Sequence, residues 1–246
     1  MDGPCVIGAT GGSGTRAFAR IVRRGGVDIG SHVNVSEDAL ELAAFLDRWI
    51  DRFMSVSPLP PSMEARMLAD LKDTLKRHQR GDGRSYGWKE PRSLFLLPFF
   101  VRHLSGLRLL HAVRDGRDIA FSSNQNQLRK HGRALLAPDE DAWPEPVRSI
   151  VLWSRVNGLT ADYGEALLPG RYLRVRYEDL CAHPTDVVRR ILDFFGLSGD
   201  AEEIARQEVL PAPSLGRWRR QDPDILARLH DAGGTALQRF GYETLV

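Results

Sequence analysis

A glycine-rich turn stands close to the start of the chain. It follows four apolar or small residues (Cys5, Val6, Ile7 and Ala9) and precedes an amphipathic run at residues 17–22. Backbone N–H groups in such a turn, with the N-terminus of the next helix, can surround a phosphate or a similar anion. Glycine lets the anion approach closely and permits positive φ. The sequence therefore predicts an anion site formed by Gly11, Gly12, Ser13, Gly14, Thr15 and Arg16.

Arg16 places a permanent positive charge in the first turn of the predicted helix. A cation there is unfavourable beside the helix dipole unless an anion is bound. The alternative interpretation is a tight strand-to-helix turn that binds nothing.

A second group of basic residues lies further along the chain. Arg114 follows an apolar strand predicted at residues 107–113, and Ser122 comes eight positions later. An arginine fork and a short hydroxyl are suitable donors for a phosphate. The alternatives are an ion pair between Arg114 and Asp118, and a Ser122 hydroxyl bonded to its own backbone. Farther downstream, the arginine-rich stretch at residues 211–221 contributes Arg217, Trp218 and Arg219, of which the tryptophan could stack on a base or simply pack.

A small number of residues are candidates for charge neutralisation and for acid–base chemistry. Lys89 lies at the end of a short strand predicted near residues 86–91, and it could neutralise charge on a leaving group. A solvated strand-end lysine is the alternative. The candidates for a general base are carboxylates, with His32 behind them: Glu37, Asp38 and Glu90.

Strands and helices alternate along the chain, which predicts an α/β fold with a mainly parallel central sheet and helices on both faces. Ligands bind such sheets at the carboxyl ends of the strands, so the glycine turn, Lys89 and Arg114 should share one rim. We expect a single domain over residues 1–246. The local expectations are a short strand at 27–30, a helix capped by Ser36, a loop at 80–84, a helix over 93–103 with a kink at Pro98, and an irregular segment at 131–146.

The amino-acid composition limits the classes of protein to which the chain can belong. Apolar residues make up 42% and charged residues 27%, as in ordinary globular enzymes. The net charge is only +2 despite 34 basic residues, so no nucleic-acid groove is indicated.

The two cysteines and the remaining residues show no disulfide or metal-ligand pattern. No apolar run reaches the length of a membrane helix, and the first strand begins within five residues of Met1, which leaves no room for a signal peptide. We therefore expect a cytoplasmic protein without stable membrane insertion.

Two common nucleotide motifs can be compared with the glycine turn. No Gly-Lys-Ser/Thr follows it, so it is not a Walker A loop. Residues 12–17 fit G-x-G-x-x-A, and Asp38 lies roughly where a ribose-binding acid would fall, so an NAD(P)-binding oxidoreductase is an alternative. The Tyr-x-x-x-Lys pair of a short-chain dehydrogenase is absent from the sequence.

Taken together, the motifs resemble the sulfotransferase family, whose members use 3′-phosphoadenosine 5′-phosphosulfate (PAPS) and release the bisphosphate PAP. The resemblance rests on the glycine turn, on R-D-G-R-D-I-A-F-S from Arg114 to Ser122 and on L-G-R-W-R at 215–219. It also rests on the stretch Y-L-R-V-R-Y-E-D-L-C-A-H-P-T-D-V-V-R-R-I-L-D-F-F-G-L at 172–197. It implies a P-loop-like three-layer fold. It also implies that the glycine turn binds the 5′-phosphosulfate, that Arg114 and Ser122 bind the 3′-phosphate, and that residues 215–219 close over the nucleotide.

The resemblance further implies an acceptor with a hydroxyl or amine, such as a glycan, a lipid or a small molecule, and it requires no metal. We expect residues 32–86 and 131–146 to bind this acceptor. Many members carry a lysine where Gly12 stands, and Arg16 and Lys89 are the available substitutes. A nucleotide-binding protein that has lost catalysis is therefore a further alternative. The oligomeric state is not predicted.

Overall fold

The computed structural model describes residues 3–56, 58–79 and 85–243. The loop predicted at 80–84 lies outside the described residues.

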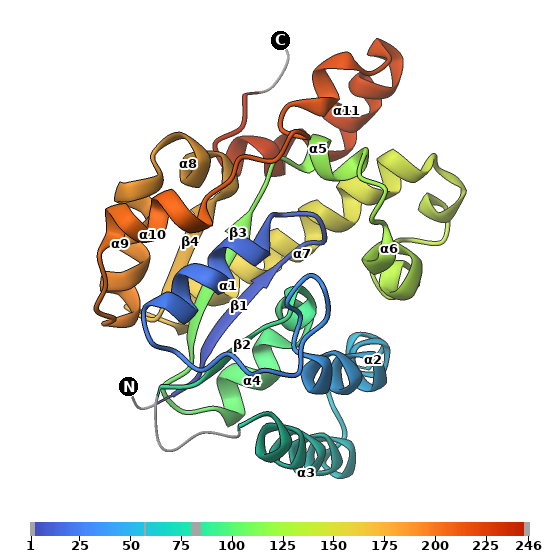
Figure 1. Ribbon diagram of the computed structural model, residues 1–246. Coiled ribbons are helices and arrows are strands. Elements are labelled where there is room, and N and C mark those ends of the chain that lie inside the picture. The colour runs from blue at the N-terminus through green and yellow to red at the C-terminus, as the bar shows by residue number, and fades with distance from the viewer. Residues whose placement is uncertain (1–2, 57, 80–84, 244–246) are drawn as a thin grey trace.

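Four parallel strands form the central sheet, in the order β2-β1-β3-β4 (Figure 1). Their bounds are β1 (Cys5–Ala9), β2 (Gly87–Lys89), β3 (Arg108–Val113) and β4 (Tyr172–Arg176). In the register, Cys5 of β1 pairs with Gly87 on one side and with Arg108 on the other. β1 is therefore an inner strand, and all five of its residues are buried.

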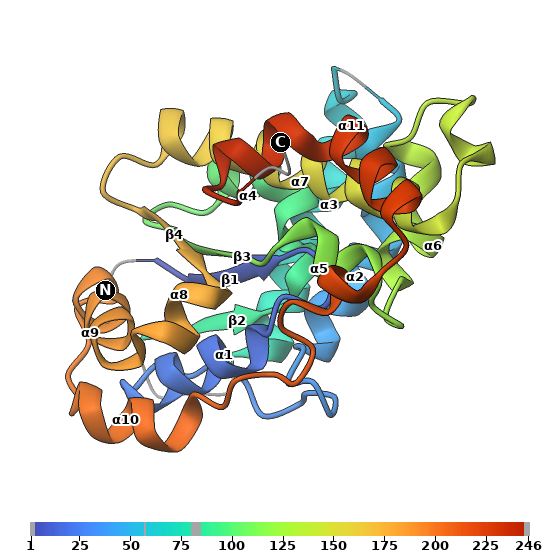
Figure 2. The ribbon, with the colours of Figure 1, turned by 90° about the horizontal axis from the view of Figure 1, so that it is seen from above.

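The alternation of side chains along β1 divides the core between the two faces of the sheet. Cys5, Ile7 and Ala9 point into one apolar cluster, and Val6 points into another. The first cluster is covered by four helices, which lie on one side of the sheet in Figure 2. They are α1 (Thr15–Arg24), α8 (Tyr177–Ala182), α9 (Pro184–Phe195) and α10 (Ala201–Glu208).

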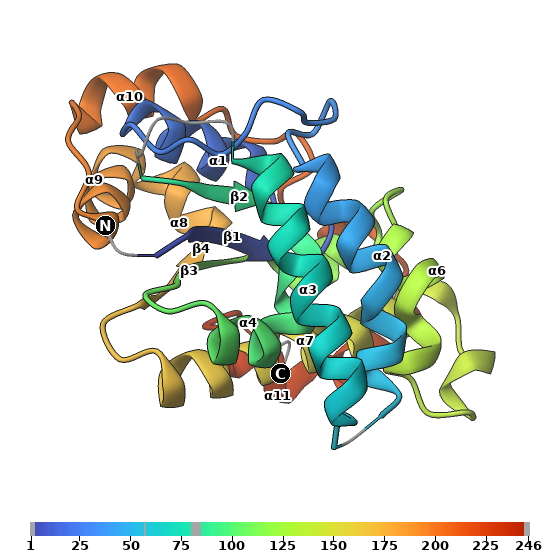
Figure 3. The same cartoon turned by 90° about the horizontal axis from the view of Figure 1, so that it is seen from below.

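The opposite face carries the second cluster, which includes Val6, Trp88 and Leu109. Figure 3 shows the helices on this side and along the edge next to β2. They are α2 (Leu40–Met54), α3 (Pro61–His78), the 3₁₀ helix η1 (Pro91–Leu96), α4 (Leu97–His103) and α7 (Glu145–Leu167).

A third cluster lies beyond the end of β3, around Val113 and Trp153. It joins α5 (Gly116–Ala120), α7, the 3₁₀ helix η4 (Arg217–Arg220) and α11 (Pro223–Arg239). The remaining helices are α6 (Asn126–His131), η2 (Gly132–Ala134) and η3 (Glu140–Ala142).

The predicted α/β class with helices on both faces of a parallel sheet is confirmed. Two local predictions are wrong. Residues 27–30 form only an isolated bridge from Asp28 to Tyr86. The helix expected after Ser36 begins at Leu40, because residues 34–38 form a turn in which the Asn34 side chain accepts two backbone N–H groups. The interruption expected at Pro98 in the apolar helix over 93–103 is present, because η1 ends at Leu96 and Pro98 lies in the first turn of α4.

The segments that follow β1, β2 and β3 carry the predicted anion and catalytic residues. Residues 11–16 follow β1, Lys89 is the last residue of β2, and Arg114 directly follows β3. Because the strands are parallel, these residues meet at one edge of the sheet. Among the described residues, no helix is both long and apolar enough to cross a membrane.

Candidate active site

The glycine turn leads from β1 into α1 and exposes backbone donors. Gly12 and Gly14 have φ values of 84° and 70°, which are favourable only for glycine. Within the described part of the chain, no protein acceptor is recorded for the N–H groups of Gly11, Gly12 and Gly14. The hydroxyl of Ser13 is buried and donates to the Thr10 carbonyl at 2.8 Å, which fixes the turn internally. The turn can therefore offer its N–H groups to an anion without rearranging.

Tyr177 packs against the other side of this turn. A Cβ added at Gly14 would lie 2.3 Å from the tyrosine ring, so no side chain fits there. The Tyr177 hydroxyl accepts the backbone N–H of Ala212 at 3.2 Å, which connects the turn to the C-terminal segment. Burial raises the pKa of Tyr177 to about 12, so the hydroxyl remains protonated. Tyr177 is the first residue of α8 and directly follows β4, which fixes its ring beside the turn.

Arg114 and Ser122 both lie beside Gly12. Arg114 Nη1 donates to the Gly12 carbonyl at 3.1 Å, and a Cβ built on Gly12 would be 3.4 Å from Ser122 Oγ. Arg114 is 3% exposed, and its Nε is buried without a hydrogen-bond partner. Arg114 also forms the ion pair with Asp118 that the sequence offered as an alternative, at 3.0 Å. This ion pair involves Nη2 and leaves Nε without a partner. The structure thus brings together the two residues predicted to hold a phosphate.

A second guanidinium lies next to the first. Arg217 Nε and Arg114 Nη2 both donate to the Ser214 carbonyl, at 3.2 and 2.7 Å. Burial and, second, the charge of Arg114 lower the pKa of Arg217. Two arginines next to one buried carboxylate, Asp118, leave an excess positive charge. That excess and the unpartnered Arg114 Nε fit a phosphate group.

Asp118 also fixes the segment that carries Arg217. Its carboxylate accepts the backbone N–H of Gly216 at 2.9 Å and that of Trp218 at 3.3 Å. Asp115 caps the start of α5, where its carboxylate accepts the N–H of Arg117.

Trp218 is 8% exposed and packs in the third apolar cluster. The Arg117 guanidinium lies 3.7 Å from the centre of its ring, and that of Arg219 lies 4.9 Å from it. Its ring thus packs among arginine side chains, and the contact of Trp218 with a base stays a prediction.

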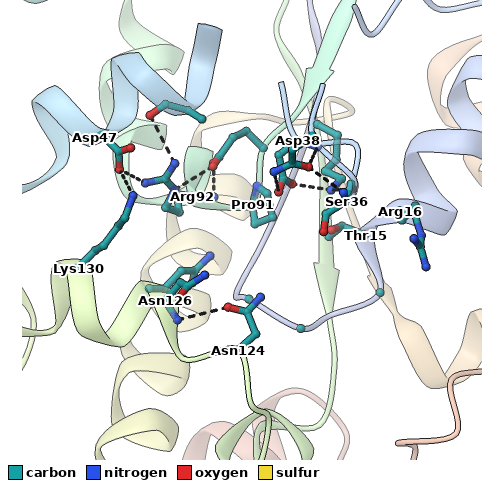
Figure 4. A pocket seen from close by; sticks show the side chains of 18 residues that line it. Thr15, Arg16, Ser36, Asp38, Asp47, Pro91, Arg92, Asn124, Asn126 and Lys130 are labelled. Atoms are coloured by element: carbon teal, nitrogen blue, oxygen red, sulfur yellow. Dashed lines mark hydrogen bonds and ion pairs between the residues drawn. The ribbon is translucent and has the colours of Figure 1, made fainter. Parts of the chain in front are cut away.

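A cavity of about 460 Å³ opens beside the glycine turn (Figure 4). It is lined by residues of the turn and by Lys89 and Asp38. The side chain of Lys89 is 1% exposed, and its ammonium donates to Asp38 Oδ1 at 2.6 Å and to the Ser36 carbonyl. Asp38 Oδ2 accepts from Asn34 at 2.9 Å. The predicted lysine and one predicted base therefore form an ion pair in the cavity wall.

The other candidates for the general base are placed differently. Glu37 has φ 63° and pairs with Arg20 and Arg23 on the outer side of α1, so its carboxylate does not line the cavity. His32 pairs with Glu41.

Glu90 lines the cavity but is held by Arg92, whose backbone N–H and Nε donate to it at 2.7 and 2.8 Å. Burial raises the pKa of Glu90, while Arg92 acts in the opposite direction. Arg16 is exposed, lines the cavity and points away from Asp38 in Figure 4.

The residues of the far wall of the cavity were not singled out from the sequence, although Asp47 belongs to the segment 32–86 expected to bind the acceptor. Asp47 of α2 accepts from Arg92 of η1 and, at 2.8 Å, from Lys130 of α6. Burial acts to raise the pKa of Asp47, but the hydrogen bonds from Lys130 and Arg92 outweigh it, and the pKa lies below its usual value. Three amide side chains complete this wall: Asn124, Asn126 and Gln127. A signal existed in the sequence, since Asn-Gln-Asn-Gln at 124–127 is an unusual run of amides.

The cavity thus receives residues 34–47 of the first segment expected to bind the acceptor. The second expected segment, 131–146, contributes no described residue to it, and its place is taken by residues 124–130. No cluster of His, Cys, Asp or Glu suited to a metal ion occurs in the described ranges.

The fold of this chain is that of solved α/β sulfotransferase structures. One is a sulfotransferase from Alicyclobacillus acidocaldarius, with 16% identity and a TM-score of 0.56 over 97% of this chain and 94% of that one. A second is the sulfotransferase domain of the Synechococcus PCC 7002 olefin synthase, with 18% identity and a TM-score of 0.54 over 99% and 97%. A third is retinol dehydratase in complex with retinol and PAP, with 14% identity and a TM-score of 0.51 over 99% and 82%.

The sequence itself gives the family. A profile described as "Sulfotransferase family" matches residues 30–201, which is more than half of the chain. The chain belongs to the sulfotransferase family. A search of curated proteins found no significant match.

Proposed function

We propose that this protein transfers a sulfuryl group from PAPS to a hydroxyl or amine of an acceptor and releases PAP. One observation carries the proposal: the glycine turn with its unsatisfied N–H groups lies between the arginines Arg114 (buried) and Arg217 (half-buried) and a cavity whose wall contains a Lys–Asp ion pair. The family match supports the reaction class. The presence of PAP in a solved structure of the same fold supports the nucleotide.

The residues fit the nucleotide in two places. The N–H groups of residues 11–16 would bind the 5′-phosphosulfate, with Arg16 near them. Arg114, Ser122 and Arg217 would hold the 3′-phosphate, for which the unpartnered Nε of Arg114 is a ready donor. Arg219 would contribute positive charge at the surface of the same segment.

When bound, the nucleotide supplies the sulfuryl group. Lys89 has three N–H donors, and two are used on Asp38 and the Ser36 carbonyl. The third can neutralise negative charge that develops beside the glycine turn, where Gly12 has no side chain to do so. Asp38 is the candidate base that lines the cavity without being bound to an arginine. We therefore assign Asp38 as the general base that removes the proton from the acceptor.

Two alternatives remain from the sequence. Family membership favours sulfuryl transfer over an NAD(P)-dependent oxidoreductase. A non-catalytic nucleotide-binding protein would keep the arginines and the glycine turn, and it would differ only in turnover. The single-domain organisation and the cytoplasmic location stay predictions.

The experiment is a comparison of ligands by thermal unfolding. PAP at a concentration of 100 times its Kd should stabilise the protein by about 2.7 kcal/mol. Adenosine monophosphate, ATP and NAD should give clearly smaller shifts at equal concentration. A larger shift with NADP than with PAP would contradict the proposal. Consumption of sulfur-labelled PAPS with a mixture of acceptors then separates an enzyme from a binding protein.

A further inference from the structure

We propose that the acceptor is a neutral, polyhydroxylated molecule of the sugar class, held by the wall of the cavity formed by Asp47, Arg92, Lys130, Asn124, Asn126 and Gln127. This names the acceptor of the sulfuryl transfer proposed above and rests on it. We refer to these six residues as the polar wall.

The polar wall offers little surface to an apolar acceptor. No Phe, Tyr or Trp occurs among the described residues that line the cavity, and its small apolar side chains are Ala43 and Pro91. Pockets for aromatic or steroid ligands are lined mainly by apolar and aromatic groups. A phenol or sterol here would desolvate charged and amide groups without replacing their hydrogen bonds, which is costly.

The charges of the polar wall are balanced when Glu90, which lies beside it in the cavity lining, is included. Asp47 and its neighbour Glu90 carry two negative charges, and Arg92 and Lys130 carry two positive charges. Asp47 pairs with both cations, and Glu90 pairs with Arg92. A charged acceptor would therefore find no free counter-charge on this wall, which favours a neutral one.

The amides provide what a hydroxyl-rich molecule needs. Gln127 is 8% exposed, and its Oε1 is buried without a hydrogen-bond partner. The Asn124 side chain accepts the backbone N–H of Asn126 at 3.3 Å. The side-chain amide of Asn126 has no protein partner within the described residues. An amide offers both donors and an acceptor, and a hydroxyl group can pair with either.

Gln127 also connects the polar wall to the place of transfer. Its Cδ would be 3.8 Å from a Cβ built on Gly11, so the amide borders the glycine turn. A hydroxyl bound to Gln127 would therefore lie beside the turn. The cavity volume of about 460 Å³ is in the usual range for small-molecule sites.

The first experiment measures sulfuryl transfer from labelled PAPS to a panel of acceptors, after binding of PAP has been confirmed by calorimetry. The neutral sugars are methyl glucoside, methyl galactoside, N-acetylglucosamine and lactose, and the comparison acceptors are glucuronic acid, a naphthol and a 3-hydroxysteroid. We expect kcat/KM for the best neutral sugar to exceed that for every comparison acceptor at least tenfold. Transfer to a comparison acceptor that comes within tenfold of the best neutral sugar, or exceeds it, overturns the inference. Failure of PAP to bind, or binding of PAP without transfer to any acceptor of either group, instead overturns the proposed function.

The second experiment uses Gln127→Met and Asn126→Ala with the best neutral sugar. Loss of one hydrogen bond should raise KM about tenfold, while Kd for PAP stays within about twofold. Arg129→Ala is the matched control, because Arg129 lies exposed on the same helix and does not line the cavity. If Gln127→Met does not fold, Asn126→Ala alone decides. An unchanged KM in the variants that fold shows that the polar wall does not bind the sugar.

Discussion

Replacing Lys89 and replacing Asp38 should reduce the stability of the protein by different amounts, although the two side chains form one ion pair. Lys89 is 1% exposed at its side chain and Asp38 is 20% exposed. Asp38→Asn would leave a buried ammonium without its counter-charge, whereas Lys89→Met would leave a carboxylate that still reaches water and still accepts from Asn34. The two substitutions are close in size, so changes in packing are small.

The magnitudes follow from this difference in burial. Removal of one partner of a buried pair costs about 3–5 kcal/mol, and Asp38→Asn should lie near the lower end because the amide oxygen still accepts from Lys89. Lys89→Met should cost about 1–3 kcal/mol, the range for an incompletely satisfied polar group. The double variant removes both charges and should be more stable than Asp38→Asn alone.

Urea unfolding gives these stabilities, and calorimetry with PAP together with PAPS turnover gives function. Both single variants should bind PAP nearly normally and lose kcat on the order of a hundredfold or more, as expected for groups that act in the transition state. The double variant should regain stability without regaining activity. The reasoning is refuted if Lys89→Met turns over normally, or if Asp38→Asn is no less stable than Lys89→Met.

Three further predictions concern other parts of the site and the core. Arg114→Ala should weaken PAP about ten- to a hundredfold and adenosine monophosphate hardly at all in calorimetry, and equal losses would mean that Arg114 only supports the fold. Gly14→Ala should cost about 1–3 kcal/mol more than Gly26→Ala in urea unfolding, because both have positive φ but only Gly14 faces the Tyr177 ring; equal costs would contradict this. Burial lowers the pKa of His111 to about 4, against about 6.5 in the unfolded chain. The contribution of the neutral imidazole to stability is therefore complete above about pH 6.5, and it is lost as the pH falls towards 4 because the unfolded chain binds the proton more readily. From about pH 7 to about pH 4 the protein should therefore lose about 3 kcal/mol more stability than His111→Gln, and parallel pH profiles would exclude this role.

The sequence predicted those parts of the site that lie next to a strand end. Lys89 and Arg114 could be placed on one rim because parallel strands end at the same edge, and the glycine turn was visible from its composition. Glu37 and Asp38 are adjacent in the chain, yet only Asp38 lines the cavity. The left-handed conformation of Glu37 and its two arginine partners on α1 decide this, and neither is visible in a local pattern.

The polar wall could not be predicted because three elements distant in sequence build it. Asp47 of α2 meets Arg92 of η1 and Lys130 of α6, across separations of 45 and 83 residues. Trp218 was ambiguous for a similar reason, since its environment depends on Arg117, about a hundred residues earlier. In both cases tertiary packing, and not local propensity, determines which side chains are accessible.

The place of β1 within the sheet has a consequence for how the chain folds. β1 is made first, but its hydrogen-bonding partners begin at Gly87 and at Arg108. Every strand pairing in the sheet is long-range, which slows folding because large loops must close before two strands can pair. Until then both edges of an apolar strand are unpaired and prone to association with other chains. Chaperone dependence during synthesis should thus be concentrated in the interval before β3 emerges.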